Sequence, residues 1–176
     1  GRMLVARTSP AELETRIFEI VNQLDRGAAL IRSAEERQQV ADLNLLAGKR
    51  ARTSTANASA LTYFAAGRAM LGDDCWESQY RLVFDLELHL AECEFLTGEL
   101  AAAESRLSIL LGRAATVVHR AAVTHLRQAL YTTLNRPDRA IDVGLEYLRS
   151  VGIEWSQRPP EENVRDATVA AGMFGA

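Results

Sequence analysis

The sequence predicts an all-α protein built from antiparallel pairs of helices. Hydrophobic residues make up 48% of the chain but aromatic residues only 6%, and the apolar set is rich in Ala and Leu. Runs of Val, Ile and Thr, which are typical of strands, are nearly missing. Apolar residues recur instead at helical spacing over residues 80–111, on both sides of Gly98. This stretch therefore predicts two helices joined by a tight glycine turn.

The two helices of this central pair differ in how they present apolar residues. Over residues 80–96 apolar side chains surround most of the helix, which predicts burial from several sides. Over residues 100–111 they keep to one face, and Ala103 is the small residue that lets the helix axes approach to about 8 Å. An ordinary antiparallel bundle uses the same devices, so it stays open as an alternative.

Two capping boxes predict helix starts in the N-terminal half. They are the sequences SPAE at residues 9–12, with Pro at the first helical position, and SAEE at residues 33–36. The expected helices cover residues 10–25, 33–53 and 56–71, with a turn at residues 54–55. Residues 72–74 close the second pair, and Asp74 is expected to cap the next helix.

The C-terminal part predicts one more helix pair and a tail. Helices are expected over residues 116–134 and 140–151, with Asn135 and Pro137 in the turn between them. We expect three segments: the tail of a truncated upstream helix at 1–8, a helical repeat domain at 9–155, and a Pro-containing tail at 156–176 with a possible short helix over 161–171. The apolar start of the chain predicts self-association through that end, because a cut helical array uncovers a face that a neighbour would cover.

Small residues recur at one place in the predicted pairs. Ala60, Ala103 and Ala140 each follow a turn by the same interval, and the intervals between them are longer and less even than about 34 residues. With that departure, the pattern resembles the tetratricopeptide (TPR) family, whose helix pairs touch through small residues. The resemblance implies a TPR-like right-handed superhelix of helix hairpins.

Four stretches resemble a more particular class of protein. They are residues 18–24, 47–61, 91–98 and 144–148. They are similar to the helical region that follows the ATPase module in large bacterial signalling proteins, which carry a serine/threonine-kinase-like domain, a GAF domain and a sensor histidine kinase. This resemblance implies a non-catalytic, cytoplasmic scaffold of a two-component system, with kinase activity in other parts. Related repeats occur in ATPase-type transcription activators, which remain the alternative.

The TPR resemblance also implies a ligand groove. In TPR proteins the first helix of each pair lines a concave groove that contacts the ligand. The matching positions here carry mixed charge and suit a peptide partner or a neighbouring domain: Asp42, Lys49, Arg52, Asp85, Glu92, His125 and Thr132. Exposed helix faces would carry the same residue types, so a purely solvated surface is the competing interpretation.

Patterns for catalysis or cofactor binding are missing from the sequence. Residues 46–50 (LAGKR) resemble the end of a phosphate-binding loop, but position 43 is Leu and position 50 is Arg where the first Gly and the hydroxyl residue belong. The histidines lack the neighbours of a phospho-accepting His, and His125 is the nearest candidate for a phosphotransfer bundle, a minor alternative. Five scattered carboxylates are expected to be solvated: Asp73, Asp74, Glu77, Glu92 and Glu94. We expect no catalytic residue, no metal and no cofactor.

Charge and cysteine content also limit the possible partners. The net charge of −3 gives no reason to expect nucleic acid or a membrane surface as partner. The basic cluster at residues 49–52 has no aromatic residues among its charges, so it predicts a solvated face. Cys75 and Cys93 have no CxxC partner and predict free thiols in a reducing compartment, hence the cytoplasm.

Overall fold

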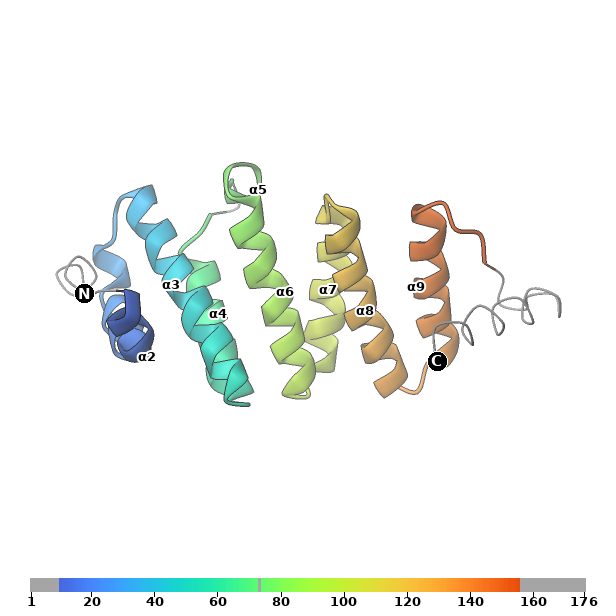
Figure 1. The fold of residues 1–176 in the computed structure, drawn as a ribbon, viewed down its shortest axis with the longest axis horizontal. Coiled ribbons are helices and arrows are strands. Elements are labelled where there is room, and N and C mark those ends of the chain that lie inside the picture. The colour runs from blue at the N-terminus through green and yellow to red at the C-terminus, as the bar shows by residue number, and fades with distance from the viewer. Residues whose placement is uncertain (1–9, 73, 156–176) are drawn as a thin grey trace, which may run out of the picture. The chain divides into compact units, whose positions relative to one another are not determined.

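The computed structural model describes residues 10–72 and 74–155, with side chains from residue 16 onward, and its regular structure is all helical. This confirms the all-α prediction. In chain order the elements are α2 (Pro10–Arg26), the 3-10 helix η1 (Ala28–Leu30), α3 (Ala34–Thr53), α4 (Asn57–Ala69), α5 (Cys75–Ser78), α6 (Tyr80–Leu96), α7 (Leu100–Arg113), α8 (Val117–Thr133) and α9 (Pro137–Ser150) (Figure 1). The helices expected within 1–8 and 161–171 lie outside the described residues.

The chain divides into two compact units, Gly1–Ala114 and Ala115–Ala176. The first contains α2 to α7 and the second contains the pair α8 and α9. The predicted boundaries at residues 8 and 155 stay predictions, as does the right-handed superhelix.

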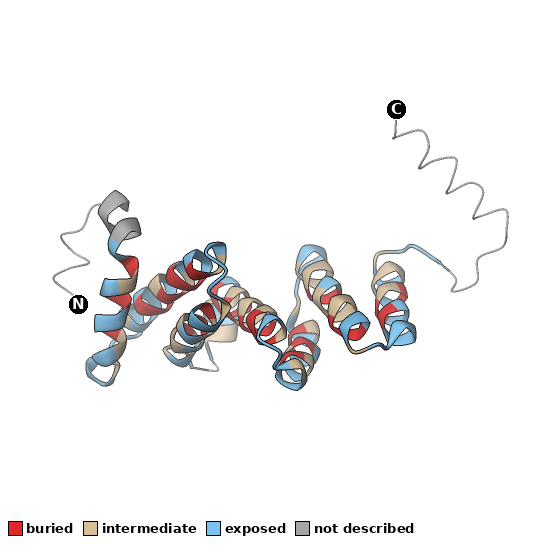
Figure 2. Ribbon diagram, turned by 90° about the horizontal axis from the view of Figure 1, so that it is seen from below, coloured by how far each residue is buried: buried red, intermediate tan, exposed pale blue. Residues whose placement is uncertain are grey.

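In the first unit each helix packs on its neighbours along the chain. α3 packs on α2 and α4, and α6 packs on α4 and α7. A lighter contact joins α3 directly to α6. Figures 1 and 2 agree that α3 and α6 form one layer while α4 and α7 lie behind them. α6 is therefore buried from several sides, as its sequence predicts.

The core of the first unit lies between α3, α4 and α6. Its members are buried side chains and small residues: Ala41, Ala51, Ala60, Phe64, Leu71, Leu82, Val83, Leu86, Leu90 and Cys93. Figure 2 shows the buried positions as stripes along the helices rather than on all sides. The α2 stripe of Ile17, Ile20, Val21 and Leu24 is buried as expected and packs on α3 and its neighbours.

One turn geometry recurs between the paired helices. Thr55, Gly98 and Asn135 have φ values of 57°, 88° and 54°, in the left-handed region. In each turn the next N–H donates to the carbonyl five residues back, and the second helix begins immediately afterwards: Ala56 to Ala51, Glu99 to Glu94 and Arg136 to Tyr131. This bond satisfies a helix-end carbonyl that would otherwise lack a partner. Thr55 and Asn135 adopt this conformation without being glycine, at turns that the sequence also predicted.

The three predicted contact alanines are all buried. Ala60 and Ala103 are fully buried and Ala140 is 9% exposed. Each stands five residues after its left-handed turn residue, so the turn sets which face of the second helix meets the first. The repeated helix pair is therefore present in the structure, although its intervals are uneven.

We expect Ala103→Leu to lower the free energy of unfolding by about 1–3 kcal/mol, because added methylenes at a close helix contact force side chains or backbone to shift. Ala102→Leu is the matched control, since its neighbour Ala102 is exposed on the same helix. Urea unfolding of the two variants measures the difference. Equal stability of the two variants would contradict this packing.

Two local predictions differ from the structure. Asp74 precedes the short helix α5, but its backbone is already helical and its side chain makes no capping hydrogen bond. α9 starts at Pro137 rather than Ala140, since proline suits the first turn of a helix. The helix start predicted at SAEE is confirmed, because the Ser33 hydroxyl accepts from the Glu36 N–H at 3.1 Å.

Candidate functional site

Helix α6 carries two charged stripes that face different neighbours. Asp85, His89 and Glu92 follow one another at intervals of four and three, so they share one side of the helix. Glu87 and Glu94, seven residues apart, share another. The first stripe meets α3 and the second meets α4 and α7.

We give the name α3/α6 surface to the charged residues that meet between these two helices. It consists of Asp42, Lys49 and Arg52 of α3 and of Asp85 and Glu92 from the first stripe of α6. Lys49 Nζ lies 3.7 Å from Asp85 Oδ2, and Arg52 forms an ion pair with Glu92. Four of the seven residues predicted to line a groove thus meet in pairs across two helices. Asp42 is exposed on α3 and, with Asp85, borders a shallow depression of about 400 Å³ beside the start of α6.

His89 links this surface to the core, a role that its sequence context did not indicate. Its ring stacks on the buried ring of Phe64 with centroids 5.0 Å apart. Its Nδ1 lies 3.0 Å from Arg52 Nη1 and 3.5 Å from Glu92 Oε2. Since a guanidinium only donates, His89 Nδ1 accepts from Arg52 when it carries no proton and donates to Glu92 when it carries one.

Two carboxyl pKa values on this surface shift in opposite directions. The hydrogen bond from His89, together with the charge of Arg52, holds the pKa of Glu92 below its ordinary value against the opposing effect of burial. Partial burial raises the pKa of the Asp42 carboxyl, although the residue as a whole is exposed, and no paired cation offsets the effect. On this surface the charged form is therefore favoured at Glu92 and disfavoured at Asp42.

We expect Glu92→Gln to lower the free energy of unfolding by about 1 kcal/mol at pH 7, because the charge that Arg52 neutralises is lost. A lowered folded-state pKa gives stability that is present above the ordinary value of 4.5 and is lost as pH falls through the folded value. The gap between wild type and variant should therefore close in acid. Urea unfolding across pH measures it, with exposed Glu99→Gln as control. A gap that widens in acid would refute the assignment.

The remaining two predicted groove residues lie in the second unit. His125 and Thr132 are exposed on α8, and the Thr132 hydroxyl donates to the Gln128 carbonyl of its own helix at 2.8 Å. Their membership of one groove with the α3/α6 surface stays a prediction. As a phosphotransfer candidate, His125 has the exposure that the chemistry needs, but that function stays untested.

The second stripe of α6 forms a charge network that the sequence did not reveal. Arg106 of α7 donates from Nε and Nη2 to the two oxygens of Glu94, at 2.9 and 2.7 Å, and from Nη1 to Glu87. Arg68 of α4 donates from Nε to Glu87 at 2.7 Å. Glu94 is buried, so the expectation that it is solvated is wrong. The hydrogen bonds that Arg106 donates raise its pKa, and the bond to Glu94 has the largest effect.

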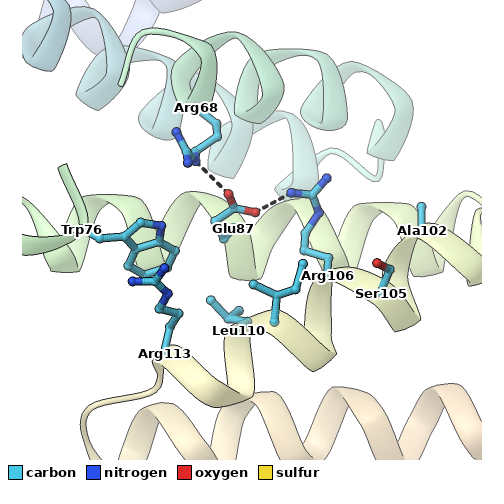
Figure 3. Close-up of a pocket in the computed structure, with 9 residues that line it drawn as sticks. Arg68, Trp76, Glu87, Ala102, Ser105, Arg106, Leu110 and Arg113 are labelled. Atoms are coloured by element: carbon cyan, nitrogen blue, oxygen red, sulfur yellow. Dashed lines mark hydrogen bonds and ion pairs between the residues drawn. The ribbon is translucent and has the colours of Figure 1, made fainter. Parts of the chain in front are cut away.

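Beside this network lies a pocket of about 570 Å³, here called the α4/α7 pocket (Figure 3). Its main lining residues are Arg68, Trp76, Glu87, Arg106, Ile109 and Arg113. The Arg113 guanidinium lies 5.4 Å from the centre of the Trp76 ring. The pocket is formed wholly within the first unit and shares no residue with the α3/α6 surface.

Other chemistry is limited among the described residues. They contain no group of three or more His, Cys, Asp and Glu side chains placed to hold a metal ion. Both cysteines are free, and burial raises the pKa of the Cys93 thiol to about 11, which makes it a poor nucleophile. None of the described helices combines the length and apolar character needed to span a membrane. Asp73, one of the five carboxylates expected to be solvated, lies outside the residues that the structure describes.

The chain is similar to the hybrid signal transduction histidine kinase G of Dictyostelium discoideum. The two are 33% identical over 146 residues, which cover 78% of this chain and 4% of the relative. The chain thus spans a small part of that protein's length. No protein-family profile matches the chain, and no solved structure matches it. The relative comes from an organism that is not a bacterium, so a bacterial origin stays a prediction.

Proposed function

We propose that this chain is a non-catalytic interaction scaffold within a signal-transduction protein, and that the α3/α6 surface contacts a peptide or a neighbouring domain. The observation that carries the proposal is the paired charge array across α3 and α6, in which Lys49, Arg52, Asp85 and Glu92 stand together on adjacent helices. Stacked helix pairs present such side chains on a rigid face, and mixed charge provides specificity for a partner.

The similarity to a histidine kinase supports the signalling context. The relative's printed name describes a hybrid histidine kinase, which favours a sensor-kinase context over the transcription-activator alternative. We infer that any kinase activity belongs to other parts of such a protein, because the sequence lacks a phosphate-binding loop and the described residues lack a metal cluster. A cytoplasmic location is part of the proposal and is consistent with the two free cysteines.

Hydrogen exchange of the chain alone and within its full natural polypeptide tests the proposal. We expect α3 and α6 to gain protection in the longer protein, most strongly near Lys49 and Asp85. A double variant, Lys49→Asp with Asp85→Lys, keeps the ion pair within the chain but exchanges the positions of its positive and negative charges, so that a partner meets the opposite charge at each position. It should remove the added protection. Unchanged exchange on α3 and α6 in the full polypeptide would contradict the proposed contact.

A further inference from the structure

The α4/α7 pocket is anchored to the core by a series of aromatic rings. Trp76 lies 6.1 Å from Tyr80, and Tyr80 lies 5.6 Å from the fully buried Phe84, measured between ring centres. The Arg113 guanidinium lies over the Trp76 ring. Trp and Arg side chains held in this way are the residue types that dominate binding energy at protein interfaces, because they lose little freedom on binding.

The lining of the pocket carries excess positive charge. Three arginines line it, while Glu87 is its single lining carboxylate and Glu94 binds Arg106 from outside the lining. The carboxylates are recessed: the Glu87 side chain is 15% exposed, compared with 29% for Arg106. Arg113 is exposed. Because the cations of the lining are more exposed than its carboxylate, they present a positive field to an approaching partner.

The shape of the pocket follows one stripe of α7. Ala102 and Ser105 are small and leave space, and Ile109 is 65% exposed. Ile109 stands between Arg106 and Arg113, which are two turns and about 10 Å apart along the helix. An apolar contact flanked by two cations is therefore fixed at helical spacing.

We propose that the α4/α7 pocket docks an acidic amphipathic helix of a partner protein. Carboxylates seven residues apart on that helix meet Arg106 and Arg113, and an apolar side chain between them packs on Ile109 and Trp76. Helices dock into such grooves through residues at intervals of three, four and seven. Glu87 favours carboxylates over phosphate, because a dianion here would face a fixed negative charge. This inference does not rest on the α3/α6 surface.

Fluorescence polarisation with a designed peptide tests the docking. The probe is a fluorescein-labelled, Ala-based helical peptide with Glu at positions i and i+7 and Leu at i+3 and i+4; its matched control has Gln for both Glu. We expect the 176-residue chain to bind the Glu peptide at least about fivefold more tightly than the Gln peptide. Equal binding of the two, or no binding of the Glu peptide, would overturn the proposal.

Variants on the protein side locate the site. Arg113→Gln should weaken the Glu peptide about five- to tenfold, and Ile109→Ser should weaken both peptides, while exposed Arg37→Gln on α3 should change nothing. Thermal melts by circular dichroism confirm that each variant is folded. An equal loss with Arg37→Gln would indicate non-specific attraction and refute the site. Displacement of the peptide by single-stranded DNA at equal concentration would refute a protein partner.

Discussion

Phe64→Ala is expected to lower the free energy of unfolding by about 3–5 kcal/mol. The Phe64 ring is fully buried and packs between α3 and His89 of α6. It also covers Gly48: a β-carbon built there would stand 2.3 Å from Phe64 Cε1, far inside normal contact distance. The ring therefore occupies the space that a glycine in the middle of α3 leaves open.

A double-mutant cycle isolates this contact. Gly48→Ala alone should destabilise by about 1–3 kcal/mol through overpacking, but should cost much less in the Phe64→Ala background, where the ring is gone. Gly112→Ala is the matched control, because nothing lies within 4 Å of the added methyl and alanine favours the helix. Urea unfolding measures all four variants. Additive costs in the cycle would show that the ring and the glycine are not coupled.

Arg106→Met is expected to lower the free energy of unfolding by about 2–3 kcal/mol. Removing one partner from a buried ion pair costs about 3–5 kcal/mol, and the partial exposure of the Arg106 side chain reduces that figure. The loss arises because Glu94, whose side chain is 9% exposed, keeps its charge without the cation that satisfies both oxygens. Methionine keeps the length of the side chain and fills the space.

The origin of this loss can be checked by neutralising the carboxylate that loses its cation. Adding Glu94→Gln to Arg106→Met should recover much of the stability, because the buried charge is removed while Glu87 keeps its ion pair with Arg68. Arg16→Met, which breaks an exposed pair with Glu19, should change stability little. Chemical denaturation of the three variants gives the comparison. Failure of the double variant to recover would assign the loss to packing of the arginine stem.

The predicted groove residues came from the resemblance to TPR helix pairs. That resemblance assigned Lys49 and Arg52 to one helix and Asp85 and Glu92 to another. Their pairing required knowing that α3 touches α6 directly. His125 and Thr132 belong to the second compact unit, so their place in a groove stays a prediction. His89 was missed because stacking on Phe64 has no local sequence signal.

The sequence by itself determined the all-α class, most helix bounds and the buried alanines. Those features depend on spacing along one helix and on the chemistry of Gly98 and Ser33, which act locally. The tertiary structure alone decided that Glu94 is buried with Arg106, that Phe64 covers Gly48, and that Arg113 lies over Trp76. Each of these contacts joins different helices, and their rotation and separation are set by the packing of whole side-chain layers, which no single segment encodes.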